Sequence, residues 1–223
     1  MGYVWDFSAV VPFFPVLLKG LLVTFKITFF TLFFSTLIGV FVGIYLNQSK
    51  SLIKKVIHFI LDFFKAVPML ILILWFYFLI PELTGLRDLS AFTLVVIAMT
   101  TNVSAFMADF IRAGINNIPK EHIEAGRSLG LTKFQVWRHI ILPEVIHNTL
   151  PMFTAYYIFV FIYSSLASSV SVYELTHAAN KVIMLNFRSL EVYTIIAIMY
   201  AIVVLPFYFF ARKLEKKSKK VII

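Results

Sequence analysis

Two carboxylate–histidine pairs are the residues whose spacing fits metal chemistry. Glu144 precedes His147 by three positions, and Glu174 precedes His177 in the same way. On a helix, each pair lies on one face, and two such pairs facing one bundle core hold the metals of di-iron carboxylate proteins. A membrane metalloenzyme is therefore one interpretation. It requires the two pairs to meet, and the sequence contains no His-Glu-x-x-His zinc motif.

Nucleotide chemistry has no motif of its own in this chain. A P-loop needs the pattern Gly-x-x-x-x-Gly-Lys-Ser/Thr to hold phosphates, and that pattern does not occur. We therefore expect the chain to bind no cofactor and no metal, so that any use of ATP and Mg²⁺ belongs to another protein. Cysteine is absent, which excludes disulfides and thiolate metal sites.

The composition predicts an all-α integral membrane protein. Hydrophobic residues make up 61% of the 223 positions and charged residues only 14%, whereas soluble domains are about 45–50% apolar and about 25% charged. The formal net charge of +9 collects in loops and in the tail at residues 212–223. Basic loops orient a chain in the membrane, so we attribute the positive charge to membrane orientation. We therefore expect the chain to contact lipid and to bind no nucleic acid.

Five stretches are long and apolar enough to span a bilayer as helices, since a span needs about 20 such residues. They are residues 21–46, 56–80, 92–111, 150–172 and 192–210. Lysine and arginine are concentrated between the third and fourth spans and in the tail, which predicts an outside N-terminus and a cytoplasmic C-terminus. In that topology the two Glu-x-x-His pairs lie on opposite sides of the membrane, which argues against the metalloenzyme.

The segment 113–149 carries the clearest local signals. Pro119 suits the first turn of a helix, and Gly130 suits the left-handed residue that ends one. Thr132 followed by Gln135 is a capping box, so a second helix is expected to start at once. The segment thus predicts a cytoplasmic hairpin of two short helices.

The far end of this hairpin is marked by Pro143, which is expected to disturb the second helix where the chain turns toward the fourth span. The hairpin is either a plain connector between two spans or a docking surface for a cytoplasmic partner. Physical arguments alone leave both interpretations open.

Seven hairpin residues occur in a fixed order: Glu124, Ala125, Gly126, Gly130, Ile141, Leu142 and Pro143. This order resembles the loop signature of the permease subunits of bacterial ABC importers, Glu-Ala-Ala, three residues, Gly, and about nine residues before Ile-x-Leu-Pro. Gly126 stands where alanine is usual, which loosens the helix by about 1 kcal/mol.

Two further segments resemble the polar amino-acid uptake subfamily, which includes systems for glutamate and aspartate and for histidine and glutamine. Residues 63–68 are similar to its Phe-Arg-Gly-Thr-Pro segment, with Lys65 in place of Arg. Residues 104–115 are similar to its Ala-Tyr-x-x-Glu-x-x-Arg-x-Gly-Ile stretch, with Asp109 in place of Glu. The similarity covers about residues 17–214, within a single domain of residues 1–223.

The resemblance implies a type I importer subunit in the bacterial inner (plasma) membrane. Its expected partners are ABC ATPase subunits, a second permease that is identical or homologous, and a periplasmic or lipid-anchored binding protein that delivers an amino acid. The hairpin, with Glu124 and Gly130, is expected to couple to the ATPase. This chain itself is not expected to be an enzyme.

Polar residues inside the spans are candidates for a translocation path, because intramembrane polar groups are costly and often functional. These are Asn102, Asp109, Arg112, Ser164 and Ser165. Asp109 and Arg112 are three apart and are expected to pair structurally on one helical face. The serines also suit helix packing.

Two features of the first span have structural explanations. Gly39 and Gly43 predict close approach of another helix. Lys26 is expected to snorkel to the membrane surface, with contact to an anionic substrate group as the alternative.

Two questions stay open. A stand-alone secondary carrier or channel is the other transport interpretation, although no inverted repeat supports it. The other question is which amino acid is carried. Where the subfamily has Lys-Asp-Thr-Ser-Leu in the fourth span, this chain has Ile162-Tyr163-Ser164-Ser165-Leu166, so both charges are missing and the sequence does not identify the amino acid. Trp75-Phe76-Tyr77 with Pro81 resembles the permeases for glutamate and aspartate.

Overall fold

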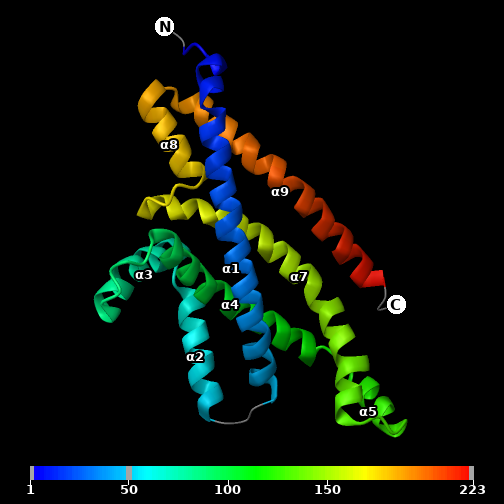
Figure 1. The fold of residues 1–223 in the computed structure, drawn as a ribbon. Coiled ribbons are helices and arrows are strands. Elements are labelled where there is room, and N and C mark those ends of the chain that lie inside the picture. The colour runs from blue at the N-terminus through cyan, green and yellow to red at the C-terminus, as the bar shows by residue number, and fades with distance from the viewer. Residues whose placement is uncertain (1–2, 49–51, 221–223) are drawn as a thin grey trace.

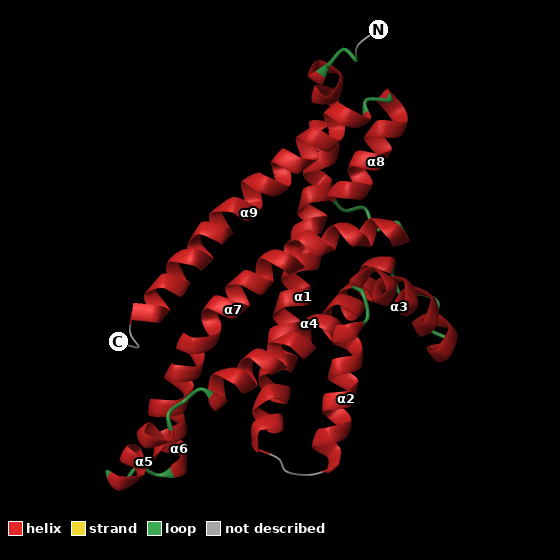
Figure 2. Cartoon of the chain, turned by 180° about the vertical axis from the view of Figure 1, so that it is seen from behind, coloured by secondary structure: helices red, strands yellow, loops and turns green. Residues whose placement is uncertain are grey.

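The computed structural model describes residues 3–48 and 52–220, and within these ranges every regular element is helical (Figures 1 and 2). Of the basic tail at residues 212–223, the last three residues and the side chains beyond Lys213 lie outside the described part. In chain order the elements are η1 (Phe7–Phe13), α1 (Phe14–Gln48), α2 (Leu52–Ala66), α3 (Met69–Thr84), α4 (Ala91–Asn116), α5 (Lys120–Ser128), α6 (Lys133–Val136), η2 (Trp137–Ile141), α7 (Leu142–Tyr163), η3 (Ser164–Val170), α8 (Leu175–Asn186) and α9 (Ser189–Lys220).

Four helical runs are long and apolar enough to cross a membrane, and the count is five if the bent pair α2 and α3 is taken as one span. The runs are Phe7–Asn47, Ala91–Asn116, Lys133–Val170 and Ser189–Lys213. The predicted all-α membrane fold with about five spans is therefore confirmed. The segment that departs from a simple span is the second one.

Pro68 breaks that second span. The sequence predicts one helix over residues 56–80, but α2 and α3 meet there at 109°. Proline has no N–H for the helical ladder, and it disfavours helical geometry at the preceding residue, here Val67. Pro68 itself is extended, with φ −56° and ψ 137°. The chain therefore changes direction sharply between two helices.

The fourth span is longer than predicted. Helices α6, η2, α7 and η3 follow one another without a loop, so Pro143 does not end the second hairpin helix. A wide π-type turn at Trp137–Ile141 precedes Pro143, where the missing N–H would interrupt an α-helical ladder. After this span, α8 is an additional helix of 12 residues, which is too short to cross a bilayer.

Helices α1 and α4 pack at the centre of the structure. A Cβ atom added to Gly39 would lie 2.3 Å from Met107 Cβ, and one added to Gly43 would lie 2.7 Å from the Ala108 carbonyl oxygen. The predicted close helix approach is confirmed. A core of buried residues that includes Met99 and Met107 surrounds this contact.

Different elements form the two ends of the molecule. The N-terminal segment, η1 and α8 lie at one end, and α5 with α6 lies at the other (Figures 1 and 2). A second apolar cluster, which includes Val10, Leu17, Leu175 and Val192, joins the first end together. The hairpin is thus separated from the N-terminus by the full length of the helices.

Candidate functional site: the helical hairpin and the α2–α4 polar contacts

The first hairpin helix, α5, begins directly after Pro119. Pro119 is the cap, with φ −58° and ψ 134°, and the helix runs from Lys120 to Ser128. This confirms the expectation that the proline marks the start of a helix. Glu121 lies in the first turn and Arg127 in the last, so both charges complement the helix dipole.

A Schellman motif ends α5. Gly130 has φ +77°, and its N–H donates to the Arg127 carbonyl at 3.0 Å, while the Leu131 N–H donates to the Gly126 carbonyl at 3.2 Å. These two bonds satisfy carbonyls that the helix end leaves free, and they require the left-handed residue that glycine supplies. The predicted turn at Gly130 is confirmed.

The second helix, α6, starts two residues later with the predicted capping box. The Thr132 Oγ1 accepts from the Gln135 N–H at 3.3 Å, and the Thr132 N–H donates to Gln135 Oε1 at 2.9 Å. Each side chain satisfies a backbone donor that the helix start leaves free. The turn between the helices is therefore fixed at both ends by local bonds.

Gly126 faces the second arm of the hairpin. It is buried, and a Cβ atom added there would lie 2.4 Å from Ile140 Cδ1. The other close atoms, from Val136 and Leu131, are about a full contact distance away, at 3.5 and 3.6 Å. Only the tip of one flexible side chain opposes a larger residue at this position.

Gly126→Ala is therefore expected to change the stability of the hairpin by less than about 1 kcal/mol, because the gain in helix propensity of about that size offsets the shift of Ile140. Melting temperature and uptake of the variant test this expectation. Ala125→Gly, at the exposed neighbouring position, is the control and should destabilise α5 by about 1 kcal/mol. A tenfold loss of uptake in Gly126→Ala would show that the glycine itself is needed.

The outward surface of the hairpin is partly apolar. Glu124 and Ala125 are exposed on α5, and Leu129 at 81% and Phe134 at 72% exposure are apolar side chains with little cover. We call these four residues the hairpin surface. An acidic group among exposed apolar ones suits contact with another protein better than contact with water alone.

The base of the hairpin is tied to the fourth span. His122 Nδ1 lies 2.7 Å from Glu144 Oε1, which joins α5 to the first turn of α7. Ile141, Leu142 and Pro143 lie at this junction and form the end of η2 and the start of α7. Glu144 of the first Glu-x-x-His pair is therefore engaged with His122.

Glu174 of the second pair caps a helix. It is fully buried and accepts from the Thr176 N–H at 2.9 Å and the His177 N–H at 2.8 Å at the start of α8. Burial raises the pKa of this carboxyl, although those backbone hydrogen bonds oppose the rise. Among the described residues, no group of three or more metal-binding side chains comes together.

Asp109 and Arg112 on α4 both contact side chains of α2. Asp109 pairs with Lys65, which also lies 2.8 Å from Asp62. Arg112 Nη1 lies 2.9 Å from His58 Nε2. The predicted pairing of Asp109 with Arg112 is wrong, because each finds a partner on the neighbouring helix instead.

Asn102 makes a third contact from α4 to α2. Its side-chain Nδ2 donates to the backbone carbonyl of Phe64 at 2.7 Å, and the residue is only 5% exposed. The sequence offered no signal for this partner. We call these three links, from Asn102, Asp109 and Arg112, the α2–α4 polar contacts.

The serines of the fourth span bond to their own helix. Ser164 donates to the Phe161 carbonyl at 2.6 Å and Ser165 to the Ile162 carbonyl at 2.8 Å. Ser164 is fully buried. Both hydroxyls thus serve the tightly wound η3 segment, and their oxygens keep lone pairs free to accept.

Lys26 is exposed on α1 among aromatic side chains. Phe25, Phe29, Phe30 and Phe92 line the same shallow hollow. This position permits the expected snorkelling along an apolar surface.

Comparison with known proteins identifies the family. A model described as "Binding-protein-dependent transport system inner membrane component" matches residues 35–220. The chain belongs to this family. It is a permease, a multi-pass protein of the bacterial inner membrane, as the resemblance of its loop predicts.

Individual relatives agree with this assignment. The permease is 28% identical to the glutamine transport system permease protein GlnP of Escherichia coli (strain K12), over 96% of this chain and 98% of that one. It is 33% identical to the probable glutamine ABC transporter permease protein GlnM of Bacillus subtilis (strain 168), over 71% and 73%. A crystal structure of an amino acid ABC transporter with histidines has a chain that matches with a TM-score of 0.84 at 30% identity, over 96% and 100%. These matches favour an importer permease over a secondary carrier or a membrane metalloenzyme.

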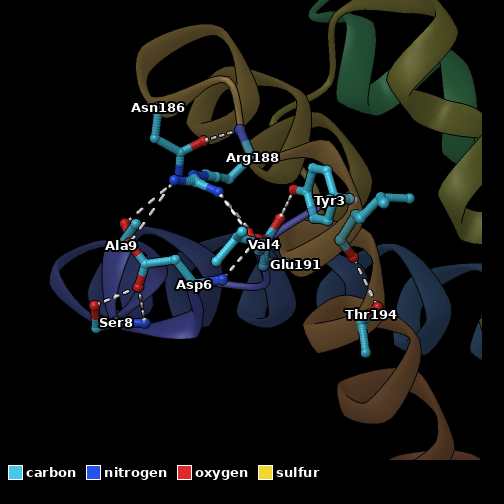
Figure 3. Close-up of polar contacts among 10 residues, drawn as sticks. Tyr3, Val4, Asp6, Ser8, Ala9, Asn186, Arg188, Glu191 and Thr194 are labelled. Carbon is cyan, nitrogen blue, oxygen red and sulfur yellow. Dashed lines mark hydrogen bonds and ion pairs between the residues drawn. The ribbon is translucent and has the colours of Figure 1, made fainter. Parts of the chain in front are cut away.

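The permease also has a polar network at its N-terminus that the sequence did not suggest (Figure 3). Glu191, fully buried at the start of α9, accepts from the Tyr3 hydroxyl and from the Asp6 N–H, the latter at 2.9 Å. Arg188 Nη1 lies 3.5 Å from Glu191 Oε1 and donates to the Val4 carbonyl at 3.0 Å. The network fastens the N-terminal segment to the turn between α8 and α9.

Glu191→Ala is expected to release this segment, because it removes the common partner of Tyr3, Asp6 and Arg188. Hydrogen exchange of the Asp6 amide should become faster by a factor of about 10 or more, since local opening governs exchange at such sites. Glu82→Ala, which removes an exposed carboxylate of α3, is the control. Unchanged protection at Asp6 would show that other contacts hold the segment.

Proposed function

We propose that this permease moves an amino acid into the cell as one half of the membrane channel of an ABC importer. ATP hydrolysis, with Mg²⁺, takes place in separate ATPase subunits, and this chain binds no cofactor. The observation that carries the proposal is the hairpin within residues 113–149, whose turn is fixed by local bonds and whose surface is exposed. A rigid, partly apolar protrusion suits the transfer of movement from another subunit.

The hairpin surface is the part that docks on the ATPase in this proposal. Glu124 supplies a charged group, and Leu129 and Phe134 supply apolar contact area. Gly130 keeps the turn tight, and the buried Gly126 lies where α5 packs against the second arm. Ile141, Leu142 and Pro143 connect this surface to the fourth span.

The other partners follow from the same proposal. A second permease, identical or homologous, completes the channel, and a periplasmic or lipid-anchored binding protein delivers the substrate. The residues of the translocation path are proposed to include Ser165, whose oxygen can still accept hydrogen bonds, while the fully buried Ser164 supports it from within η3. Asn102, Asp109 and Arg112 support the wall of the path from α4.

The substrate class is a polar amino acid. The named relatives handle glutamine, and further relatives from Bacillus subtilis (strain 168) are an arginine transport permease and an L-cystine transport permease. The path residues described above carry hydroxyl and amide groups besides paired charges. This supports the amino-acid class and leaves the particular side chain to the binding protein.

The proposed topology places the N-terminus outside and the hairpin, with the basic tail, in the cytoplasm. Because the chain has no cysteine, single cysteines report sidedness directly. Val4→Cys, at a position 76% exposed, should react with a membrane-impermeant thiol reagent added outside cells. Ser128→Cys on the hairpin should react only after the membrane is opened; the reverse pattern would invert the topology.

A reconstituted transport assay tests the function. Proteoliposomes that contain the permease, with its ATPase and binding protein, should accumulate a labelled amino acid only when ATP is supplied. Uptake that persists without the ATPase subunit would favour a secondary carrier. If the complete assembly takes up none of the amino acids that the binding protein retains, the proposal is contradicted.

A further inference from the structure

The break between α2 and α3 leaves the last backbone carbonyls of α2 without helical donors, and one of them is the Phe64 carbonyl. In an α-helix the Phe64 carbonyl accepts from the N–H four residues later, and that residue is Pro68, which has none. The ladder therefore stops with the Val67 N–H on the Phe63 carbonyl at 3.2 Å, and it resumes with the Leu72 N–H on the Pro68 carbonyl at 3.1 Å.

Asn102 supplies the missing donor from another helix. Its Nδ2 lies 2.7 Å from the Phe64 oxygen, and the side chain is buried on α4. A carbonyl left unpaired away from water is costly, so this one bond favours the bent arrangement over others. The Asn102 amide thus donates the hydrogen bond that the Phe64 carbonyl would receive from residue 68 if that residue were not proline.

A second contact holds the same end of α2. Lys65, next to Phe64, pairs with Asp109 two helical turns after Asn102 on α4. The carbonyl bond and the ion pair together fix where α2 ends and at what angle the chain leaves it. That angle is the 109° between α2 and α3.

The direction of α3 matters because of what it touches. Helix α3 packs against α4 and against η3, the segment that carries Ser164 and Ser165. A change in the angle at Pro68 therefore displaces the helix that supports η3. The effect of Asn102 reaches the path through α3.

We propose that Asn102 is a positioning residue of transport: its amide caps the Phe64 carbonyl freed by Pro68 and so holds α3 at the angle that shapes the path beside η3. The inference rests on the proposed function. It gives Asn102 a role through the backbone, and Asn102 needs no contact with the amino acid.

Restoring the backbone donor separates stability from transport. Asn102→Ala should lower the melting temperature of the purified assembly by about 3 °C or more, and it should lower uptake. Pro68→Ala returns an N–H that can reach the Phe64 carbonyl if α2 continues straight. In the double variant P68A/N102A the melting temperature should be no lower than in Asn102→Ala, because the returned N–H can take the place of the amide. It should stay below wild type, because a straight α2 withdraws Leu72 and Ile73 from the core, and uptake should stay about tenfold or more below wild type.

The single variant P68A keeps the Asn102 bond and the core contacts of Leu72 and Ile73, so the bend should persist, with melting temperature and uptake near those of wild type. Thr101→Val is the matched control, since the Thr101 hydroxyl bonds to the Ile97 carbonyl of its own helix at 2.9 Å; its uptake and melting temperature should be those of wild type. Loss of uptake in Thr101→Val would overturn the assignment to Asn102, because any change in this turn of α4 would then suffice.

Three further results would overturn the proposal. They are wild-type uptake in Asn102→Ala, wild-type uptake in P68A/N102A, and a loss of uptake in P68A as large as that in Asn102→Ala. Failure of the proposed function is distinct. The wild-type assembly would then show no ATP-dependent uptake, while the melting temperatures of wild type and the variants would still report the bond from Asn102.

Discussion

Gly39→Leu is expected to prevent the permease from accumulating as a folded, transport-competent protein. A single added Cβ atom already lies 2.3 Å from Met107 Cβ and 3.1 Å from the Ala108 backbone nitrogen. Neither atom is the end of a flexible side chain, so α1 and α4 must separate along the centre of the fold. Such overpacking costs about 3 kcal/mol or more. The yield and melting temperature of the purified variant measure the effect.

Gly85→Leu is the control for this substitution. Gly85 has φ +71°, and no atom lies within 4 Å of the Cβ that would be added. Its replacement should cost only the strain of a left-handed backbone, about 1–2 kcal/mol. Equal losses in the two variants would mean that the α1–α4 contact is no more demanding than a surface turn.

Gly130→Val is expected to reduce uptake by about tenfold or more while the spans remain folded. A β-branched residue at φ +77° is strained by about 1–2 kcal/mol or more, and the two bonds of the Schellman motif are lost as the turn relaxes. The hairpin surface then moves relative to α7. Uptake and ATP hydrolysis in the reconstituted assembly, with the melting temperature of the membrane part, distinguish loss of coupling from unfolding.

Gly130→Asn separates geometry from side-chain bulk, because asparagine tolerates the left-handed region better than other residues with a side chain. It should retain most of the uptake. Normal, coupled uptake in Gly130→Val would contradict the docking role of the hairpin.

The hairpin could be predicted because its signals are local. Pro119, Gly130, Thr132 and Gln135 each act within a few residues of their own position, through a missing N–H, a positive φ or a capping bond. The structure keeps all of these features. The number of spans could be predicted for a related reason, since it depends on the length of apolar runs.

The contacts between distant segments could not be predicted. The sequence predicts that Asp109 pairs within its own helix, yet its partner Lys65 lies 44 residues away in sequence, on another helix. The partner of Glu191 is 185 residues away at Asp6. Each partnership depends on where whole helices lie, and residue spacing along one helix carries no such information.

The unbroken helical run from Lys133 to Val170 has a mechanical consequence. Its 38 residues contain no loop, although a π-type turn, Pro151 and η3 lie along it and its path bends (Figure 1). The His122–Glu144 contact ties α5 to the same run. Because no loop separates the hairpin from η3, a displacement of the hairpin is passed along the helical backbone to the far end of the span, with no flexible linker in which it could be lost.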